Sequence, residues 1–559
     1  MKVSKQIVTD VLVIGGGAAG MRAALAAAEA GSAVLLVNKG PVARSGITLT
    51  AAGGMQAPFH PDDSPELFFQ DTVKFGYELG DQNLIKVLAE DACARALDAE
   101  RFGARIVRDT AGNFAIGRFP GQCRPRNIFF QGGGVGLASA LARACRNHPH
   151  IELKDDFFVT GLIKGSDGQP AVAGAVGLDL RTGEFTLLKA KAVVLATGGC
   201  QWLWEVNDCP TDATGDGIIY AYRAGGELVD MEMVLFYPSV IVWPPSLKGA
   251  FVHYEFLDAA ILDGNVYDKD GNAVLPKPLP VRDEAMRLMA LAIREGRGTA
   301  RGGLLWYVGD SPKGEEAVRK RLSTAQYQYL QAHGVDPAKE KVEVAPGAHY
   351  LMGGIFIDEQ CRTTIAGLFA TPECAGNFDG ANRLAGSGLT ATQVFGAKAG
   401  EAAHAWAAAM EGVDVDPASL EAETARVACR IGACSPQSRI ADLRDRLRHA
   451  VQQYAGVARE AAGLKRLLSV VDEVEDELAQ VRVPDIVVFN QPLMDVLQLA
   501  NMCEIARLVA GSALMREESR GHHFRSDFPR QDDANWLKHT VAVKGETGPR
   551  FGVRPVIRL

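Results

Sequence analysis

Two short segments in the second half of the chain combine a polar or cationic side chain with small residues. His349 lies in the segment 348–354, Arg383 lies in the segment 380–388, and both segments are rich in glycine and alanine. Such side chains bind carboxylates, and small neighbours let a planar ligand approach the backbone closely. A single histidine or arginine is more often structural than functional. The two segments therefore indicate a site for a planar ligand and a carboxylate only if other motifs support it.

A glycine-rich loop near the N-terminus gives that support. Residues 15–20 follow the apolar run 11–14 and precede an alanine-rich stretch, 21–28, that predicts a helix. Strand, glycine turn and helix are the context in which a G-x-G-x-x-G sequence binds a dinucleotide, with the pyrophosphate at the helix N-terminus. The alternative is an ordinary tight turn. The predicted cofactor contacts from this loop are Gly15, Gly17, Ala18, Ala19 and Gly20.

The next apolar run, 33–37, comes at the interval expected for the second strand of a dinucleotide-binding unit. It ends in Asn38 and Lys39, where an acidic residue usually binds the adenosine ribose of NAD. An amide can still hydrogen-bond a hydroxyl group, so Asn38 and Lys39 remain predicted cofactor contacts. The missing carboxylate disfavours NAD as the ligand.

Three further small-residue turns have the composition of ligand-binding loops. They are 40–54, 196–199 after a buried strand, and 214–217 before a predicted helix. Ligands of doubly wound sheets bind beyond the carboxyl ends of the strands, which is where such turns lie. The predicted contacts from these turns are Ser45, Gly46, Thr48, Gly53, Gly54, Thr197, Gly198 and Asp216.

Composition excludes several classes of protein. With 559 residues the chain is expected to form about two to four domains. Its net charge is −8, and no basic run alternates with aromatic residues, so nucleic acid is not an expected partner. No apolar run reaches membrane length, and no segment before the first strand resembles a signal peptide, which predicts a cytoplasmic protein without a direct membrane span. The ten cysteines are scattered, so neither a metal site nor an iron–sulfur cluster is expected in this chain.

The order of the predicted elements indicates an α/β protein with an insertion. Residues 65–104 are predicted to be helical, and strand-like runs fill 151–188. Prolines interrupt the α/β rhythm over 231–351, which also contains a charged helix at 282–295. Beyond about residue 402 the pattern predicts an antiparallel helical bundle, and the last forty residues are expected to be irregular.

Taken together, these motifs resemble the flavoprotein subunit of succinate dehydrogenase and fumarate reductase, a family that includes L-aspartate oxidase. The matches follow the family's order and cover nearly the whole chain. The matching segments are 15–20, 45–54, 196–199, 214–217, 231–232, 293–298, 349–354, 380–383 and 518–529.

The resemblance implies a fold and its division into domains. The expected fold is α/β, with a Rossmann-like FAD-binding domain, an inserted α+β capping domain and a C-terminal helical domain. The FAD-binding domain would comprise 1–230 and 352–405, and the capping domain, a lid over the substrate, 231–351. The helical domain would be 406–520 and the C-terminal tail 521–559.

The family chemistry is hydride transfer between flavin N5 and a C=C or CH–CH bond of a carboxylic acid. By resemblance, His349 and Arg383 would hold the carboxylate and Arg282 would donate the proton. Arginine is a weak acid in water, so this role requires a desolvated relay, for which Asp283 or Glu284 is the expected partner. The alternative is that Arg282 only pairs with one of these two carboxylates on its helix.

The resemblance also assigns cofactor contacts near the flavin. Glu373 would bind the FAD ribose, and Arg383, Ser387 and Leu389 would lie near the isoalloxazine ring. The family's flavin-linking histidine falls near residues 46–47, which are glycine and isoleucine here. Bound FAD is therefore expected to be noncovalent.

Several family residues that bind the second carboxylate of a dicarboxylate are replaced. The motif His-Pro-Thr-Gly is replaced by the segment 237–240, and the family's Thr-Glu-Gly segment matches 256–264 only loosely. His253 or Tyr254 are the available substitutes, and Asp379 replaces a family histidine. The pocket is expected to keep cations at one end, which favours a different enoate or a larger acid as substrate.

Three functions remain open from the sequence. The first is a fumarate reductase-type oxidoreductase acting on a small carboxylic acid. The second is an amine oxidation like that of L-aspartate oxidase, and the third is a flavin electron-transfer subunit with a relict pocket. Family members of this length pass electrons to a separate iron–sulfur subunit, which is the expected partner and the expected route of any membrane association.

Overall fold

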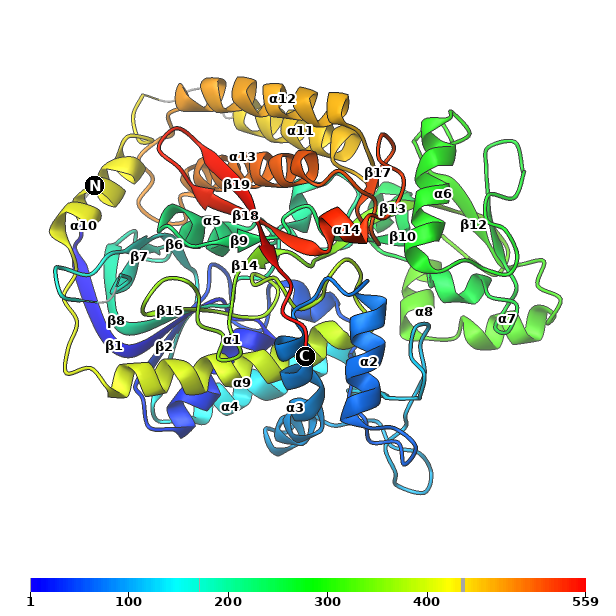
Figure 1. Cartoon of the computed structure of the whole chain (residues 1–559), viewed down its shortest axis with the longest axis horizontal. Coiled ribbons are helices and arrows are strands. Elements are labelled where there is room, and N and C mark those ends of the chain that lie inside the picture. Colours follow the sequence, from blue (N-terminus) through cyan, green and yellow to red (C-terminus); the bar gives the residue numbers. More distant parts are fainter. Residues whose placement is uncertain (1, 170, 434–437) are drawn as a thin grey trace.

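The structure is a computed structural model that describes residues 2–169, 171–433 and 438–559 (Figure 1). Its main sheet has seven strands, in the order β5-β2-β1-β8-β7-β6 with β15 also paired to β8. The strands β5, β2, β1, β8 and β15 are parallel to one another, whereas β7 pairs antiparallel with both β8 and β6. Their bounds are β1 Lys5–Ile14, β2 Val34–Val37, β5 Ile151–Lys154, β6 Phe157–Ile163, β7 Gly174–Asp179, β8 Phe185–Leu195 and β15 Leu368–Ala370. The runs 11–14 and 34–37 are wholly buried, as strands covered on both faces must be.

Three helices pack against the strands of this sheet: α1 (Ala18–Glu29), α4 (Gly133–Asn147) and α9 (Ser387–Ala408). A further helix, α3 (Gln82–Arg101), packs on α9. The helices α1 and α9 pack very closely because both are rich in alanine and glycine. A Cβ atom at Gly400 of α9 would lie 2.2 Å from the backbone oxygen of Ala23 in α1. Only glycine permits this contact, so Gly400 sets the distance between the two helices.

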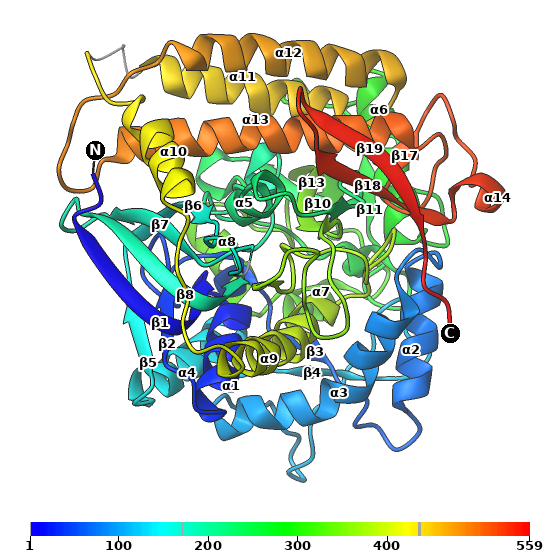
Figure 2. The ribbon, with the colours of Figure 1, turned by 60° about the vertical axis from the view of Figure 1, so that its left-hand side comes forward.

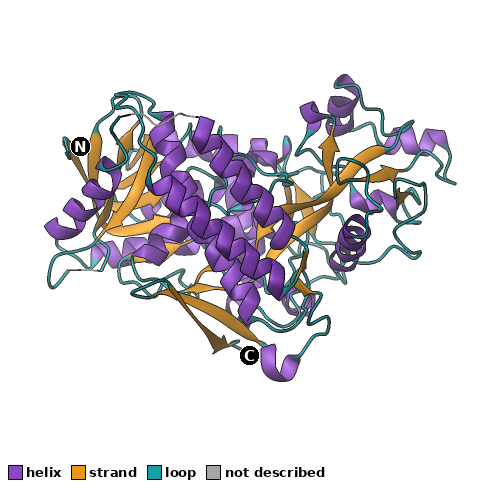
Figure 3. Cartoon of the chain, turned by 90° about the horizontal axis from the view of Figure 1, so that it is seen from above, coloured by secondary structure: helices purple, strands orange, loops and turns teal. Residues whose placement is uncertain are grey.

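A second hydrophobic core lies within residues 231–351, here called the capping region, at one end of the molecule (Figure 3). Its four-stranded sheet has the order β10-β13-β12-β11. Trp306 and Tyr327 are fully buried in this core. The elements are β10 Val234–Trp243, β11 Asn265–Tyr267, α6 Arg282–Arg294, β12 Leu304–Tyr307, α7 Glu315–Arg321, α8 Ala325–Ala332 and β13 Val342–Leu351. The predicted charged helix at 282–295 is confirmed as α6.

Helices follow beyond residue 402, as predicted, and three of them pack side by side (Figure 2). They are α11 (Ser438–Tyr454), α12 (Ala461–Ala479) and α13 (Gln491–Met515), preceded by α10 (Pro417–Ala428). Within the described residues, no helix has the length and apolarity needed to cross a membrane, and no cluster of side chains is arranged to bind a metal ion.

The expectation that the last forty residues are irregular is wrong. They contain the short helix α14 (Asp533–Trp536) and the hairpin β18 (Lys538–Lys544) and β19 (Pro549–Pro555). The hairpin joins β9 (Leu228–Val229) and β14 (Gly354–Ile355) in a four-stranded sheet. The partner strands lie far away in the sequence, so the local pattern of the tail does not reveal this pairing.

The segment just before the tail, 516–520, is held by buried charges. The side chain of Arg516 is fully buried and donates hydrogen bonds to Glu232, Asp230 and Glu518 at 2.6, 3.3 and 3.0 Å. Arg520 donates to the same Glu518 at 2.7 Å. These pairs connect the segment that follows α13 to the segment between β9 and β10, where the capping region begins.

A buried charge in the tail itself should make stability depend on pH. The ring of His539 contacts the carboxylates of Asp230 and Asp81. Burial opposes its charge, but the two carboxylates outweigh burial and raise the pKa of His539 to about 9. Because the folded pKa exceeds the ordinary value of about 6.5, this stabilisation is fully present below that value and is lost as pH rises through 9. Urea unfolding midpoints should fall between pH 6.5 and 9 in the native protein and fall less in His539→Gln. If the unfolding midpoint fell equally with pH in both proteins, His539 would not be the group responsible for this pH dependence.

Candidate active site

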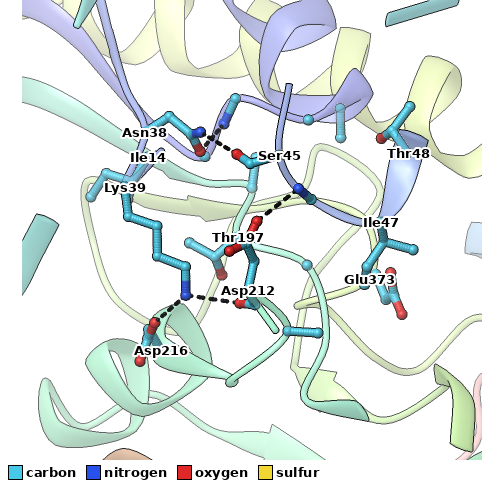
Figure 4. Close-up of a pocket in the computed structure, with 18 of the residues that line it drawn as sticks. Ile14, Asn38, Lys39, Ser45, Ile47, Thr48, Thr197, Asp212, Asp216 and Glu373 are labelled. Carbon is cyan, nitrogen blue, oxygen red and sulfur yellow. Dashed lines mark hydrogen bonds and ion pairs between the residues drawn. The ribbon is translucent and has the colours of Figure 1, made fainter. Parts of the chain in front are cut away.

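Two adjoining cavities lie at the carboxyl ends of the parallel strands. The first, shown in Figure 4, is lined by the glycine loop after β1, by the turn after β2 and by the turn after β8. The second lies between the main sheet and the capping region. The residues that line both cavities are Ile47, Thr48, Pro372, Glu373 and Thr392. The two cavities therefore form one elongated site at the place where ligands of doubly wound sheets bind.

The glycine loop has the close contacts expected of a dinucleotide-binding turn. Gly15 has a φ of +117°, and a Cβ there would lie 2.2 Å from the oxygen of Ala196. A Cβ at Gly20 would lie 1.9 Å from the oxygen of Gly15. Gly17, the N-cap of α1, lines the cavity together with Ala18 and Ala19, and the Ala18 N–H donates a hydrogen bond to Thr48 Oγ1 at 3.1 Å. This arrangement fits a pyrophosphate.

The change Gly20→Ala should abolish binding of the dinucleotide, because its methyl group would push the loop out of the cavity. The purified variant should be colourless, whereas the native protein should carry the flavin absorbance that the resemblance implies. The matched control is Gly412→Ala, whose added Cβ has no atom within 4 Å. A variant that keeps its flavin would show that this turn does not hold the cofactor.

The two residues after β2, Asn38 and Lys39, line the first cavity and also connect its walls. The Asn38 side chain accepts a hydrogen bond from Gly16 N at 2.9 Å and donates to Gly40 O and Ser45 Oγ, so its amide connects two loops. Lys39 Nζ lies 2.9 Å from Asp216 Oδ2 and closes the other side of the cavity (Figure 4). The Asn38 amide therefore holds the two loops together at the cavity wall. Its contact with a ribose stays a prediction.

Nearly all predicted cofactor residues line one of the two cavities. Gly20 lies behind Gly15 rather than on the wall, and Ser387 is buried at the start of α9 outside both cavities. Thr197 Oγ1 is buried and has no hydrogen-bond partner in the described part of the chain, as expected of a group that binds a ligand. The residues on the walls are Gly15, Gly17, Ala18, Ala19, Asn38, Lys39, Ser45, Gly46, Thr48, Gly53, Gly54, Thr197, Gly198, Asp216, Glu373, Arg383 and Leu389.

Glu373 lies at the junction of the two cavities. It accepts a hydrogen bond from Gln201, and burial raises the pKa of Glu373 to about 7. A carboxyl group whose pKa lies near 7 can accept a proton from a polar ligand or donate one to it at neutral pH. Its position between the cavities supports contact with the middle of an extended cofactor.

Three segments bring the predicted catalytic cations to the second cavity. Arg282 starts α6, His349 lies on β13, and Arg383 lies in the loop before α9. His349 Nδ1 lies 2.7 Å from Asp208 Oδ2, and the guanidinium carbon of Arg383 lies 4.2 Å from the centre of the Tyr350 ring. The cavity therefore collects three cationic or potentially cationic groups that are far apart in the sequence.

The expected partners of Arg282 are wrong. Its guanidinium forms an ion pair with Glu255, from the 3₁₀ turn Tyr254–Leu257, and Asp283 instead accepts a hydrogen bond from Tyr77. Helix geometry explains the difference, because Arg282 and Asp283 are adjacent and point in different directions. Burial opposes the charge of Arg282, but the nearby Glu255 carboxylate outweighs it and raises the pKa of Arg282.

Two acidic residues of this cavity, Asp208 and Glu255, were not expected from the sequence. Glu255 immediately precedes the segment 256–264, which was matched loosely to the family's Thr-Glu-Gly segment. If that match is shifted toward the N-terminus by two residues, Glu255 takes the place of the family's glutamate. Asp208 has no local signal, because it reaches His349 only through the packing of its loop against β13. Asp379, expected near the site, is buried, and burial raises its pKa to about 7.

Comparison with known proteins agrees with this geometry. The FAD binding domain family matches residues 10–389, and the family of the fumarate reductase flavoprotein C-terminus matches residues 444–558. The chain is 35% identical to one of the subunits of the CoM/CoB fumarate reductase of Methanothermobacter marburgensis, covering 97% of this chain and 98% of the relative.

Solved structures show the same likeness. Sdh1 of Mycobacterium smegmatis superposes with a TM-score of 0.90 at 30% identity, covering 99% of this chain and 95% of that one. The quinol fumarate reductase of Escherichia coli superposes with a TM-score of 0.89 at 30% identity, covering 99% and 98%. The fold predicted from the sequence is confirmed. The chain belongs to the fumarate reductase and succinate dehydrogenase flavoprotein family and is an FAD-dependent oxidoreductase of that type.

Proposed function

We propose that this chain interconverts the C=C and CH–CH bonds of an acid whose reacting carbons adjoin a carboxylate. Residues that line the two cavities would hold FAD, which would provide hydride-transfer chemistry for this reaction. The observation that carries the proposal is the convergence of Arg282, His349 and Arg383 on the cavity that adjoins the dinucleotide loop. The capping region, 231–351, would then be the lid domain that supplies Arg282 and His349.

The side chains have complementary roles in the reducing direction. Hydride addition to one alkene carbon moves negative charge toward the carboxylate, where Arg383 and His349 stabilise it. Arg282 delivers one proton to the neighbouring carbon, which completes the CH–CH bond. Glu255, paired with Arg282, is the group positioned to restore that proton. One hydride and one proton convert the enoate to the saturated acid, so atoms and charge balance.

The reaction is tested with the reduced flavoprotein under anaerobic conditions. Mixing with a panel of enoates, fumarate included, should restore the absorbance of oxidised flavin with at least one acid, and the saturated acid should appear in equal amount. A flavin that stays reduced with every enoate would instead favour the electron-transfer subunit. Oxygen uptake with L-aspartate would favour the amine oxidase.

We also propose that the cofactor is held without a covalent bond. Gly46 and Ile47, at the position of the family's flavin-linking histidine, carry no nucleophilic side chain, and Ile47 lines both cavities. Precipitation with acid should leave all flavin in the supernatant. Flavin that remains with the protein would contradict the proposal.

Electrons are proposed to pass between this chain and a separate iron–sulfur subunit. The proposal is supported by the relatives of this chain, which are single subunits of fumarate reductases. Copurification of a second chain with iron and acid-labile sulfide from the native source would test this partner.

A further inference from the structure

We propose that the second cavity selects acids that carry a single carboxylate and a neutral apolar or aromatic substituent, and that it discriminates against dicarboxylates. This inference rests on the proposed function, because it names the class of substrate for the same site. The charges and aromatic rings that line the cavity support this preference.

Two of the three cations in the cavity already have carboxylate partners. Arg282 forms an ion pair with Glu255, whose side chain is largely buried, and His349 pairs with Asp208, whose side chain is only 3% exposed. Each pair is close to neutral when both partners are charged. Neither pair leaves an uncompensated positive charge for a second substrate carboxylate, whereas His349 keeps a ring nitrogen with which to hydrogen-bond the one carboxylate that Arg383 holds.

Arg383 differs from the other two cations. No carboxylate of the described residues pairs directly with it, although Glu373 and Asp379 lie near enough to interact with its charge. Its Nε is buried without a hydrogen-bond partner among those residues. Its guanidinium lies over the Tyr350 ring and donates one long hydrogen bond, 3.4 Å, to Leu384 O. The nearby Asp379 offsets this charge only in part, because burial raises the pKa of Asp379 to about 7. A buried guanidinium with unused donors is suited to one carboxylate, so the cavity provides charge compensation for one anionic group.

Four aromatic side chains, here called the aromatic wall, also line the cavity, and one of them, Tyr237, lies against both Arg282 and His349. Phe119, Phe129, Tyr237 and Phe251 line the cavity, and the rings of Tyr237 and Phe251 lie 5.1 Å apart in an edge-to-face arrangement. His253 also lines the cavity, and burial lowers its pKa, which disfavours a positive charge on its ring. Aromatic edges and faces bind apolar groups and rings favourably.

A second substrate carboxylate would therefore meet rings and the carboxylates of Asp208 and Glu255. It would lose its hydration without gaining an unpaired cation, which is unfavourable in a buried site. An apolar or aromatic substituent of the same size would gain from burial at the same wall. The preference for an apolar substituent over a second carboxylate should appear as a lower dissociation constant for the monocarboxylate than for the dicarboxylate.

Binding can be measured apart from turnover. Oxidised holoprotein cannot reduce an enoate, so cinnamate and fumarate can be titrated into it and followed by calorimetry and by the shift of the flavin spectrum. Cinnamate should bind at least tenfold more tightly than fumarate. Cinnamyl alcohol, which lacks the carboxylate, should bind at least tenfold more weakly than cinnamate. A smaller ratio for either pair would overturn the proposal.

A variant of the aromatic wall gives the converse test. Phe251→Arg adds a cation to the wall without changing Arg282, His349 or Arg383, and it should strengthen fumarate binding at least tenfold while weakening cinnamate binding. The matched control is Phe489→Arg, because Phe489 is 55% exposed and lies outside the cavity. This control should leave both dissociation constants within twofold of the native values. Unchanged selectivity in a folded, flavin-containing Phe251→Arg protein would overturn the proposal.

The outcomes also separate this inference from the proposed function. Selective binding of cinnamate by a protein whose reduced flavin no enoate reoxidises would refute the redox function and leave the selectivity standing. Tight binding and rapid reduction of fumarate would support the redox function and refute the selectivity.

Discussion

The Arg282→Ala protein is expected to keep its FAD and to lose at least about a thousandfold of its turnover, the range lost when a positioned proton donor is removed. The side chain lines the substrate cavity and not the dinucleotide loop, so cofactor binding should not change. The loss should appear in kcat, because proton delivery takes place in the transition state. Flavin content by absorbance and turnover with the best enoate measure the two effects separately.

The same helix supplies a matched control for this experiment. Arg294 also lies on α6 and forms an ion pair with a glutamate, Glu460, at 2.8 Å, but it lies outside the cavity. Arg294→Ala should turn over at the native rate. If Arg282→Ala retained native turnover, or if both variants lost activity equally, Arg282 would have no specific chemical role.

Arg516→Ala is expected to cost about 3–5 kcal/mol of unfolding free energy, the usual effect of removing one partner from a buried ionic network. The substitution leaves the carboxylates of Asp230, Glu232 and Glu518 buried without the cation that they share. It also removes hydrogen bonds to two backbone oxygens, at Trp536 and Lys538. The midpoint of denaturant unfolding at pH 7 measures the loss.

An exposed arginine serves as the comparison for this prediction. Arg319 pairs with Glu315 four residues earlier on α7, and both side chains are exposed. Arg319→Ala should change the unfolding free energy by about 0.5 kcal/mol or less, as is usual for exposed helical pairs. A similar small change in Arg516→Ala would show that the buried network does not support the fold.

The glycine loop and the three cations were predictable because each depends on local sequence. The loop needs a strand, a tight turn and a helix in succession, and residues 11–28 encode all three. Arg282, His349 and Arg383 each lie in a short motif that resembles those of the family. The structure confirms that these segments meet in one cavity.

The groups that set the charge of the cavity were not predictable in this way. Asp208 and Glu255 act through partners 141 and 27 residues away in the chain. No periodicity or spacing encodes such a contact, because it depends on how separately formed elements pack. The hairpin β18–β19 was missed for the same reason, since its partner strand β9 lies more than 300 residues earlier.

The contact between α1 and α9 has a mechanical consequence. Each helix begins at one half of the binding groove, and the glycine–backbone contact leaves no room for one to slide along the other. The floor of the groove is therefore a rigid body. The capping region has its own core and contributes β10 and β13, so we expect any adjustment to substrates of different size to come from that region and not from the floor.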